Sequence, residues 1–231
     1  MDAADLARIC DAARALPALM LTVAPESVSA DQIAALTAAG AIVSLGHTDC
    51  SYDTARAAMA AGARCATHLF NAMSQLGNRE PGLVGAVLDG GGVTGMIADG
   101  IHVHPATMRL AIATKPEGIF LVSDCMAFAG TDLTEITLGG RRILRQNGRL
   151  TLEDGTLAGA DLTLPQAVAT LITQCGITAE TALAMATSRP ADVIGNRQLG
   201  RIAPGLPAML VHMPSLTAGI ARPLHGAHSP V

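Results

Sequence analysis

Short aliphatic segments alternate with alanine-rich segments of helical periodicity over the first 125 residues, and this alternation constrains the fold most. The aliphatic segments are ALMLTVAPE (18–26), AIVSLGH (41–47), RCATHLF (64–70), VTGMIADGIH (93–102) and GIFLVSD (118–124). The segments between them predict helices over 28–40, 51–62 and 105–116, each closed by Gly or Pro. Strands that alternate with helices of this length predict βα units and a parallel sheet.

The composition agrees with a buried parallel sheet and excludes several classes of partner. Half of the residues are hydrophobic but only 2% are aromatic, which suits helices packed on a buried aliphatic sheet. The net charge of −4 provides no basic field for nucleic acid or an anionic membrane.

No segment approaches the roughly 20 apolar residues of a membrane span. The N-terminal segment has early acidic residues and a helical period, so we do not expect a signal peptide. The five cysteines lack a C-x-x-C pair, which indicates reduced thiols in a cytoplasmic protein.

The pattern changes after residue 130. The segment TLGGRRILRQNGRLTLEDGTLAG (137–159) has short alternating runs and Asn-Gly and Asp-Gly turn signals, so a β-hairpin excursion is predicted at about 131–155. Two helices are predicted over 162–174 and 178–186, followed by a short strand within 201–213. The end of the chain, 214–231, has no strong periodicity and is predicted to be a loose tail. No internal repeat or low-complexity linker is evident, so one compact unit is the simplest expectation.

Polar side chains stand where the aliphatic segments end. They are Glu26, His47, His68, Asp99 with His102, and Asp124. Because the carboxyl ends of parallel strands open on one face, where active sites are built, these residues are predicted to form a site.

His47 and His68 are the predicted metal ligands. They lie 21 residues apart, a spacing typical of one βα unit. Adjacent parallel strands are about 4.8 Å apart, so imidazoles at their ends can reach one ion, at about 2.0–2.1 Å if it is zinc. The alternative is that both histidines cap helices.

Asp124 and His102 are the candidates for proton transfer and carbonyl polarisation. A carboxylate beside a metal-bound water can take its proton and later deliver it to a leaving group. The alternative for Asp124 is the N-cap of a following helix. His104 fits a surface position as well as a functional one. Glu26 has three open roles, namely a carboxylate outside the ligand sphere, a helix-leading acid, or a ligand.

The segment HLFNAMSQLGNREPGLVGAVLD (68–89) reads as a glycine-rich loop that follows a candidate ligand directly. Backbone N–H groups near Asn71 and Ala72, together with Arg79, can hold a phosphate by hydrogen bonds and charge.

These segments resemble, in the same order, the N-acetylglucosamine-6-phosphate deacetylase family of amidohydrolases. The resemblance runs from about residue 18 to about residue 210, and its most specific part is ATHLFNAM…REPG. It is carried by LTVAPE, SLGHTDCSYD, ATHLFNAMSQLGNREPGLVGAVLD, IADGIHVHP, LVSDCMAFAG and GTLAGADLTL.

The resemblance implies a role for each matching residue. It implies that His47 and His68 bind a divalent metal, zinc with iron as the alternative, and that Asp124 is the catalytic acid–base group. The implied substrate contacts are Asn71, Ala72, Arg79, Asp99, His102, Leu157, Ala158 and Gly159. The implied reaction is hydrolysis of N-acetylglucosamine 6-phosphate to glucosamine 6-phosphate and acetate in cytoplasmic amino-sugar catabolism. The Arg79 position implies a homodimer in the full-length protein.

The implied fold is an α/β metal-dependent hydrolase TIM barrel with a small β-sandwich. The family's early H-x-H pair and the glutamate ligand of its H-x-E-G-P motif have no counterpart here, and Met1 matches a point just before the fourth barrel strand. We therefore expect an N-terminally truncated, incomplete barrel over 1–195 that lacks its first strands, and a remnant of the sandwich with a tail over 196–231. Two alternatives stay open: an inactive remnant that lacks the glutamate ligand, and an amidohydrolase for a different amide or a cyclic imide.

Overall fold

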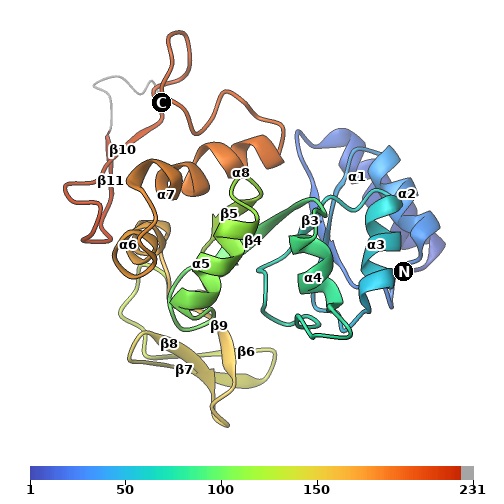
Figure 1. Cartoon of the computed structure of the whole chain (residues 1–231), viewed down its shortest axis with the longest axis horizontal. Helices are drawn as coiled ribbons and strands as arrows, with labels where there is room; N and C mark the ends of the chain where they lie inside the picture. The colour runs from blue at the N-terminus through green and yellow to red at the C-terminus, as the bar shows by residue number, and fades with distance from the viewer. Residues whose placement is uncertain (225–231) are drawn as a thin grey trace. The chain divides into compact units, whose positions relative to one another are not determined.

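The computed structural model of the chain describes residues 1–224 (Figure 1). In chain order the helices and strands are α1 (Ala3–Ala15), β1 (Met20–Val23), α2 (Ala30–Ala38), β2 (Ile42–Leu45), α3 (Tyr52–Ala60), β3 (Cys65–Ala66), α4 (Gly82–Leu88), β4 (Val93–Ile97), α5 (Pro105–Thr114), β5 (Ile119–Val122), β6 (Glu135–Leu138), β7 (Arg141–Gln146), β8 (Arg149–Leu152), β9 (Leu157–Ala160), α6 (Leu164–Cys175), α7 (Ala179–Ala186), α8 (Ser188–Val193), β10 (Leu210–His212) and β11 (Arg222–Leu224). Strands β1 to β5 form one sheet in sequential order, and the pairs β1–β2, β2–β3 and β3–β4 are parallel. The predicted βα units and parallel sheet are confirmed.

The chain divides into two compact units rather than the single unit that its sequence suggested. The first unit comprises Met1–Met96, Ala111–Phe120 and Arg189–Arg197. The second comprises Ile97–Leu110, Leu121–Ser188 and the chain from Gln198 onward. The prediction of one unit was wrong because the division depends on contacts between segments that are distant in the sequence. The absence of a low-complexity linker from the sequence does not reveal these contacts.

Strand β2 forms the buried centre of the first unit. All four of its residues are buried, and Val43 and Leu45 are 0% exposed, as expected for a parallel strand covered on both faces. The neighbouring helices start at capping residues, because Ser29 forms a capping box with Gln32 and Ser51 accepts the N–H of Thr54. Helix α1 contacts α2, α2 contacts α3, and α3 contacts α4, which Figure 1 shows in blue to green.

Helix α4 corrects the prediction that residues 68–89 form a loop throughout. It spans Gly82–Leu88, and its first six residues are buried. Two glycines lower its helix propensity, and a helix that is apolar on all sides shows no amphipathic period. The helix was missed because tertiary burial, rather than local sequence preference, stabilises it.

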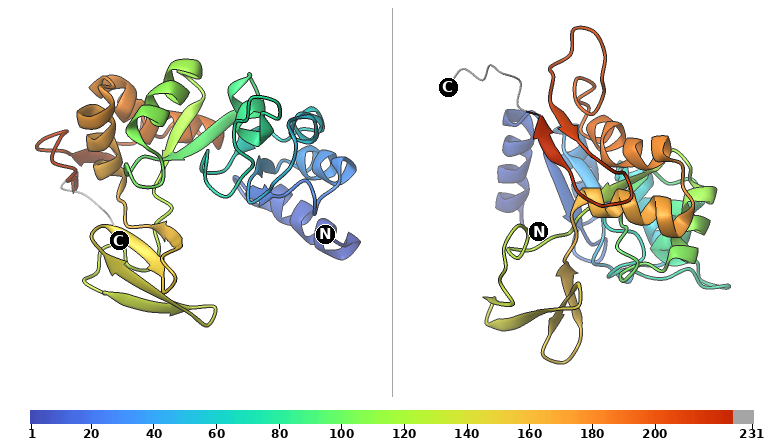
Figure 2. Two further views of the ribbon diagram at one scale, coloured as in Figure 1. Left: turned by 60° about the horizontal axis from the view of Figure 1, so that its bottom comes forward. Right: turned by 90° about the vertical axis from the view of Figure 1, so that its left-hand side faces the viewer.

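The second unit contains an antiparallel sheet in the order β6-β7-β8-β9, drawn in yellow in Figure 2. Phe128, Ile143 and Leu150 form its buried core. The β7–β8 connection places Asn147 and Gly148 at φ 52° and 72°, as the predicted Asn-Gly turn requires. The sheet includes β9, so it extends one strand beyond the predicted excursion.

The rest of the second unit confirms two predicted helices and corrects the predicted tail. Helix α6 starts at a capping box of Thr163 with Gln166 and ends at Gly176, which has φ 66°, and α7 follows it. Strand β11 pairs with β10, so residues 222–224 are not a loose tail, while the predicted tail residues 225–231 lie outside the described part. Helix α8 was not predicted from the sequence. The assignment of 196–231 to a β-sandwich stays a prediction.

None of the helices in the described part of the chain has the length and hydropathy that would let it cross a membrane.

We predict that Gly92→Ala destabilises the first unit more than Gly90→Ala. Both glycines have positive φ, 52° and 110°, but a Cβ on Gly92 would lie 2.2 Å from the Arg64 carbonyl oxygen, whereas one on Gly90 would meet nothing within 4 Å. We expect a loss of about 3 kcal/mol in the free energy of unfolding for Gly92→Ala and about 1 kcal/mol for Gly90→Ala, measured by urea denaturation. Equal losses would contradict the close approach of Gly92 to the Arg64 carbonyl oxygen.

Candidate functional site

His47 and His68 lie close together in the first unit, each two residues beyond the end of its strand. Their Nε2 atoms are 3.0 Å apart, and the ring centroids are 4.8 Å apart at an interplanar angle of 72°. Two nitrogens bound at about 2.0–2.1 Å to a tetrahedral zinc ion are themselves about 3.3 Å apart. The two imidazoles therefore have the approach expected of two ligands of one ion. Neither histidine caps a helix, because Ser51 caps the helix after His47, and α4 begins well beyond His68.

The histidine pair is not part of a larger cluster of candidate ligands among residues 1–224. Within that range no group of three or more His, Cys, Asp or Glu side chains could hold a metal ion. His68 is 7% exposed, and among the described residues its Nδ1 has no hydrogen-bond partner. A metal-bound histidine usually donates its other N–H to an acceptor. The described residues therefore fit two positions of a metal site rather than a complete coordination sphere.

The backbone around the histidines is strained in a way that sequence patterns do not reveal. His47, His68, Phe70 and Ala72 have positive φ of 50°, 33°, 77° and 46°. Non-glycine residues in this region cost about 1–3 kcal/mol each and persist only where the surrounding structure holds them. Such residues concentrate at functional sites.

The contacts of Glu26 fit the first of its three open roles, that of a carboxylate outside the ligand sphere. Its Oε2 accepts a hydrogen bond from Thr48 Oγ1 at 2.6 Å, and its Oε1 accepts one from the Asp49 N–H at 2.9 Å. Burial alone would raise the pKa of Glu26, but hydrogen bonds from Thr48 and from backbone N–H groups outweigh it and hold the pKa below its usual value. Glu26 does not lead helix α2, because Ser29 is its N-cap.

The predicted phosphate loop is anchored beside the histidines. Ala72 accepts the Thr48 N–H at 3.2 Å through its carbonyl oxygen, while the Asn71 side chain donates to the carbonyl oxygens of His68 and Leu69. Ala72 and Arg79 are exposed. An open hollow of about 480 Å³ beside this loop is lined by Ala24, Glu26, Ser27, His47, Thr48, Asp49, Ala72 and Met73.

In the second unit, Asp99 holds His102. Asp99 Oδ2 is 2.6 Å from His102 Nδ1, and Oδ1 accepts the N–H groups of Ile101 and His102, both at 2.8 Å. Both side chains are 7% exposed. Burial raises the pKa of Asp99, but the hydrogen bonds from His102 and Ile101 outweigh it and lower the pKa below its usual value. Because both oxygens are engaged within one turn, Asp99 orients the His102 ring and leaves its Nε2 available.

Asp124 is exposed and has φ 48°. Its carbonyl oxygen accepts the Ala160 N–H at 2.9 Å, so the turn after β5 is tied to β9. Gly159 has φ 78°, and a Cβ there would lie 3.2 Å from the Asp124 carbonyl oxygen. The structure therefore brings Asp124 together with the predicted substrate segment Leu157, Ala158 and Gly159. No helix begins directly after Asp124, since the next one along the chain starts at Leu164, and this excludes the N-cap alternative.

His104 has a local structural role. Its Nδ1 accepts the Ala106 N–H at 3.1 Å, and its carbonyl oxygen accepts the Met108 N–H at 3.0 Å, so it caps the start of α5. The predicted residues thus form a histidine pair with its loop in the first unit, and an Asp99–His102 pair and an Asp124–β9 contact in the second. Thr48 was not predicted as a site residue, because its only signal in the sequence is its position directly after a candidate ligand.

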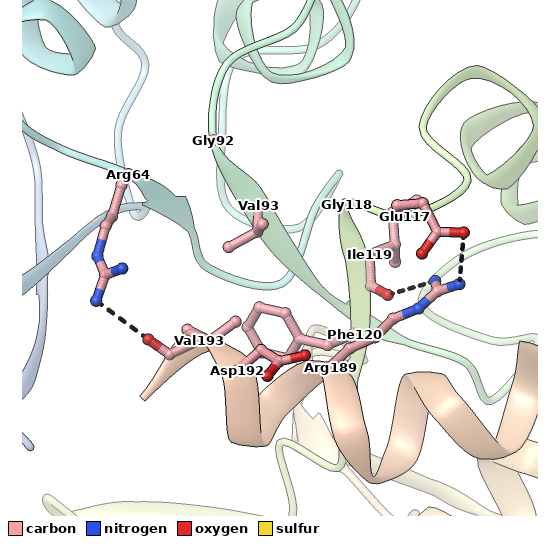
Figure 3. Close-up of a pocket in the computed structure, with 10 residues that line it drawn as sticks. All are labelled: Arg64, Gly92, Val93, Glu117, Gly118, Ile119, Phe120, Arg189, Asp192 and Val193. Carbon is pink, nitrogen blue, oxygen red and sulfur yellow. Dashed lines mark hydrogen bonds and ion pairs between the residues drawn. The ribbon is translucent and has the colours of Figure 1, made fainter. Parts of the chain in front are cut away.

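A second hollow of the first unit lies at the opposite ends of the strands (Figure 3). It has a volume of about 340 Å³ and is lined by the starts of β4 and β5, by α8, and by Arg64 before β3. Arg64 donates to the Val193 carbonyl oxygen at 3.1 Å, and Arg189 donates to that of Ile119 at 2.9 Å. Because both arginines tie α8 to the strands, their contacts describe a structural junction.

Comparison with known proteins gives consistent similarities. The family described as "Amidohydrolase family" matches residues 20–223. The chain is 42% identical over 188 residues to an N-acetylgalactosamine-6-phosphate deacetylase of Shewanella sp., covering 80% of this chain and 48% of that protein. It is 36% identical over 189 residues to an N-acetylglucosamine-6-phosphate deacetylase of Haemophilus influenzae, covering 80% of this chain and 50% of that protein. The chain therefore spans about half the length of the curated relatives it matches.

Solved structures of N-acetylglucosamine-6-phosphate deacetylases are similar to this chain as well. The chain matches an N-acetylglucosamine-6-phosphate deacetylase from Pasteurella multocida with a TM-score of 0.87 and 36% identity, covering 91% of this chain and 56% of that one. It matches a variant deacetylase from Mycobacterium smegmatis, in complex with N-acetyl-D-glucosamine-6-phosphate, with a TM-score of 0.81 and 34% identity, covering 91% and 57%. These similarities confirm the resemblance seen in the sequence and its α/β TIM-barrel fold class.

We predict that Asp99→Asn lowers stability at neutral pH and flattens its acid dependence. Because folding lowers the pKa of Asp99, the ionised carboxylate stabilises the folded state above its unfolded pKa of about 3.9. This stabilisation is lost as the pH falls through the lower folded pKa. We expect Asp99→Asn to lose about 2 kcal/mol near pH 7 and to show a smaller further loss than the wild type on acidification.

The control is Asp154→Asn. Asp154 is exposed and accepts the Thr156 N–H at 2.9 Å in the turn before β9, so we expect a smaller loss of stability than for Asp99→Asn. Urea denaturation at several pH values measures both variants, and an unchanged acid dependence in Asp99→Asn would contradict the role of the ionised carboxylate.

Proposed function

The chain belongs to the amidohydrolase family, and on that premise we propose that it carries the metal-binding and catalytic residues of a deacetylase for N-acetylated amino-sugar 6-phosphates. The facing Nε2 atoms of His47 and His68, 3.0 Å apart at the ends of neighbouring parallel strands, carry the proposal. Relatives and solved structures named as deacetylases of N-acetylglucosamine 6-phosphate or N-acetylgalactosamine 6-phosphate support it.

The proposed reaction is hydrolysis of the acetamide to acetate and the free amino-sugar phosphate. A divalent ion held by His47 and His68 would supply Lewis-acid activation of water. Asp124 then accepts a proton from the attacking water and delivers it to the amine nitrogen as the carbon–nitrogen bond breaks. His102, oriented by Asp99 through Nδ1, donates from Nε2 to the acetyl carbonyl oxygen when both ring nitrogens carry protons.

Arg79 is proposed to hold the 6-phosphate. It is exposed on a loop that is fixed by its neighbour Glu80, whose carboxylate accepts the N–H groups of Tyr52 at 2.7 Å and Gly82 at 3.0 Å. A guanidinium on an anchored loop suits a phosphate. Asn71, Ala72 and the Leu157–Gly159 segment complete the proposed substrate contacts. Because Arg79 is exposed, a homodimer in which it reaches the partner subunit's substrate is part of the proposal.

Two further assignments belong to the proposal. The metal is zinc, with iron as the alternative, since the family is metal-dependent and imidazole nitrogen suits both ions. The location is the cytoplasm, supported by the five cysteines, all of which are free thiols.

We expect the 231-residue chain to release acetate from both 6-phosphorylated sugars and much more slowly from unphosphorylated N-acetylglucosamine. Asp124→Asn should lower kcat by about 10²–10⁴-fold, because it removes the proton shuttle. Asp132→Asn, a change at another exposed aspartate of the same loop region, should leave kcat unchanged. Normal turnover by Asp124→Asn would reject the assignment, and absence of turnover by the wild type would favour the inactive-remnant alternative. Turnover of other amides or cyclic imides alone would favour the third alternative.

We expect one zinc ion to bind each chain and to raise its melting temperature. His47→Asn and His68→Asn should each abolish this rise, because each removes one of two ligands, whereas His212→Asn on exposed β10 should retain it. Calorimetric titration with zinc measures the binding. Equal zinc affinity in all three variants would contradict the histidine pair.

A further inference from the structure

We propose that Glu26 is a positioning residue that holds the Thr48–Asp49 backbone so that His47 faces His68, and that it thereby sets the metal affinity of the histidine pair. The inference rests on the metal pair of the proposed function. It assigns a role to a carboxylate that takes no part in the proposed reaction.

Glu26 accepts two hydrogen bonds from the residues directly after His47. One oxygen accepts the Thr48 hydroxyl at 2.6 Å, and the other accepts the Asp49 N–H at 2.9 Å. The same hydroxyl accepts the Cys50 N–H at 3.1 Å, which extends the connection along the loop. Thr48 is 6% exposed, so its hydroxyl is shielded from competing water, although Glu26 and Asp49 are exposed.

These hydrogen bonds of Glu26 lie just beyond the point where the backbone pairing of β1 and β2 ends. The ladder stops at Val23 opposite Leu45, and a last backbone bond runs from the Gly46 N–H to the Val23 carbonyl oxygen at 3.2 Å. Glu26 lies in the turn that follows β1, and the Ser27 and Val28 N–H groups fix that turn by donating to the Ala24 carbonyl oxygen. The carboxylate thus continues the connection between the two chain segments beyond the sheet.

His47 needs such a restraint because its φ of 50° is unfavourable for a residue with a side chain. Its strand fixes the residue on one side, at Gly46. On the other side, Glu26 acts together with the Thr48 N–H bond to Ala72 and the Ser74 N–H bond to Thr48. Without the carboxylate, the loop can relax toward ordinary backbone angles, which would turn the His47 ring away from His68.

Glu26 acts through these contacts rather than as a ligand, because both of its oxygens are already engaged. Glutamine offers a test of this distinction. Its amide oxygen can accept the Asp49 N–H, and its NH₂ group can donate to the Thr48 oxygen, so the shape of the network is kept while the charge is lost.

The experiment compares zinc affinity across variants of the full chain by competition with a chromophoric chelator. Glu26→Ala should bind zinc about 10- to 100-fold more weakly, while Glu26→Gln should stay within about threefold of the wild type, because its geometry is retained. Thr48→Val should weaken binding, and the Glu26→Ala/Thr48→Val double variant should bind no more weakly than Glu26→Ala. Asp2→Ala removes a carboxylate bond of the same type, to the Asp5 N–H at 2.7 Å, from the start of α1 and should leave the affinity unchanged.

A second measurement needs no metal. Ring centroids 4.8 Å apart predict a nuclear Overhauser effect between the His47 and His68 ring protons of the metal-free chain. It should persist in Glu26→Gln and Asp2→Ala and disappear in Glu26→Ala. If Glu26→Ala retains both the Overhauser effect and wild-type affinity, the positioning role is wrong. If the wild type binds no zinc through the histidines, the metal pair itself is wrong, and that outcome is distinct from failure of Glu26 alone.

Discussion

The approach of two imidazoles at the ends of neighbouring strands is the constraint on which the candidate site of the first unit depends. Two ring nitrogens 3.0 Å apart require either a shared proton or a cation between them, since two protonated rings repel. Parallel pairing of β2 with β3 sets the spacing of the strands, but it does not set the orientation of the imidazole rings. The left-handed backbone at both histidines sets that orientation, together with the contacts of Thr48 with Glu26, Ala72 and Ser74.

The same arrangement recurs in the second unit with different partners. The Asp99 carboxylate orients the His102 ring. Asp124 has a left-handed backbone conformation, and its carbonyl oxygen accepts the N–H of Ala160 in β9. In both units, a side chain proposed to act on the substrate follows a strand and is held by a nearby hydrogen-bond network. Burial raises the pKa values of Glu26 and Asp99, but several hydrogen-bond donors converge on each carboxylate and lower both pKa values below the usual range. Each ionised carboxylate therefore holds its donors in place.

Much of the architecture could be predicted from the sequence, because aliphatic runs closed by Gly or Pro carry the period of strands and helices. The predicted helices over 28–40, 51–62 and 105–116 contain α2, α3 and α5. The misses share one cause, which is dependence on distant contacts. Helix α4 is buried on all sides and shows no amphipathic period, and β11 exists only by pairing with β10. The division into two units likewise depends on contacts between segments far apart in sequence.

For the candidate site, the sequence by itself determined which residues were proposed and in what order, because His47, His68, Asp99, His102 and Asp124 all follow aliphatic runs that predict strands. It also determined the family, through motifs that span most of the chain. Only the tertiary structure decided how these residues are held. Glu26 had three roles of equal standing until its two oxygens were found on Thr48 and Asp49, and His104 was separated from His102 only by its cap on α5. The physical reason is that a residue's type sets which hydrogen bonds it can form, whereas the folded chain decides which partners come within reach.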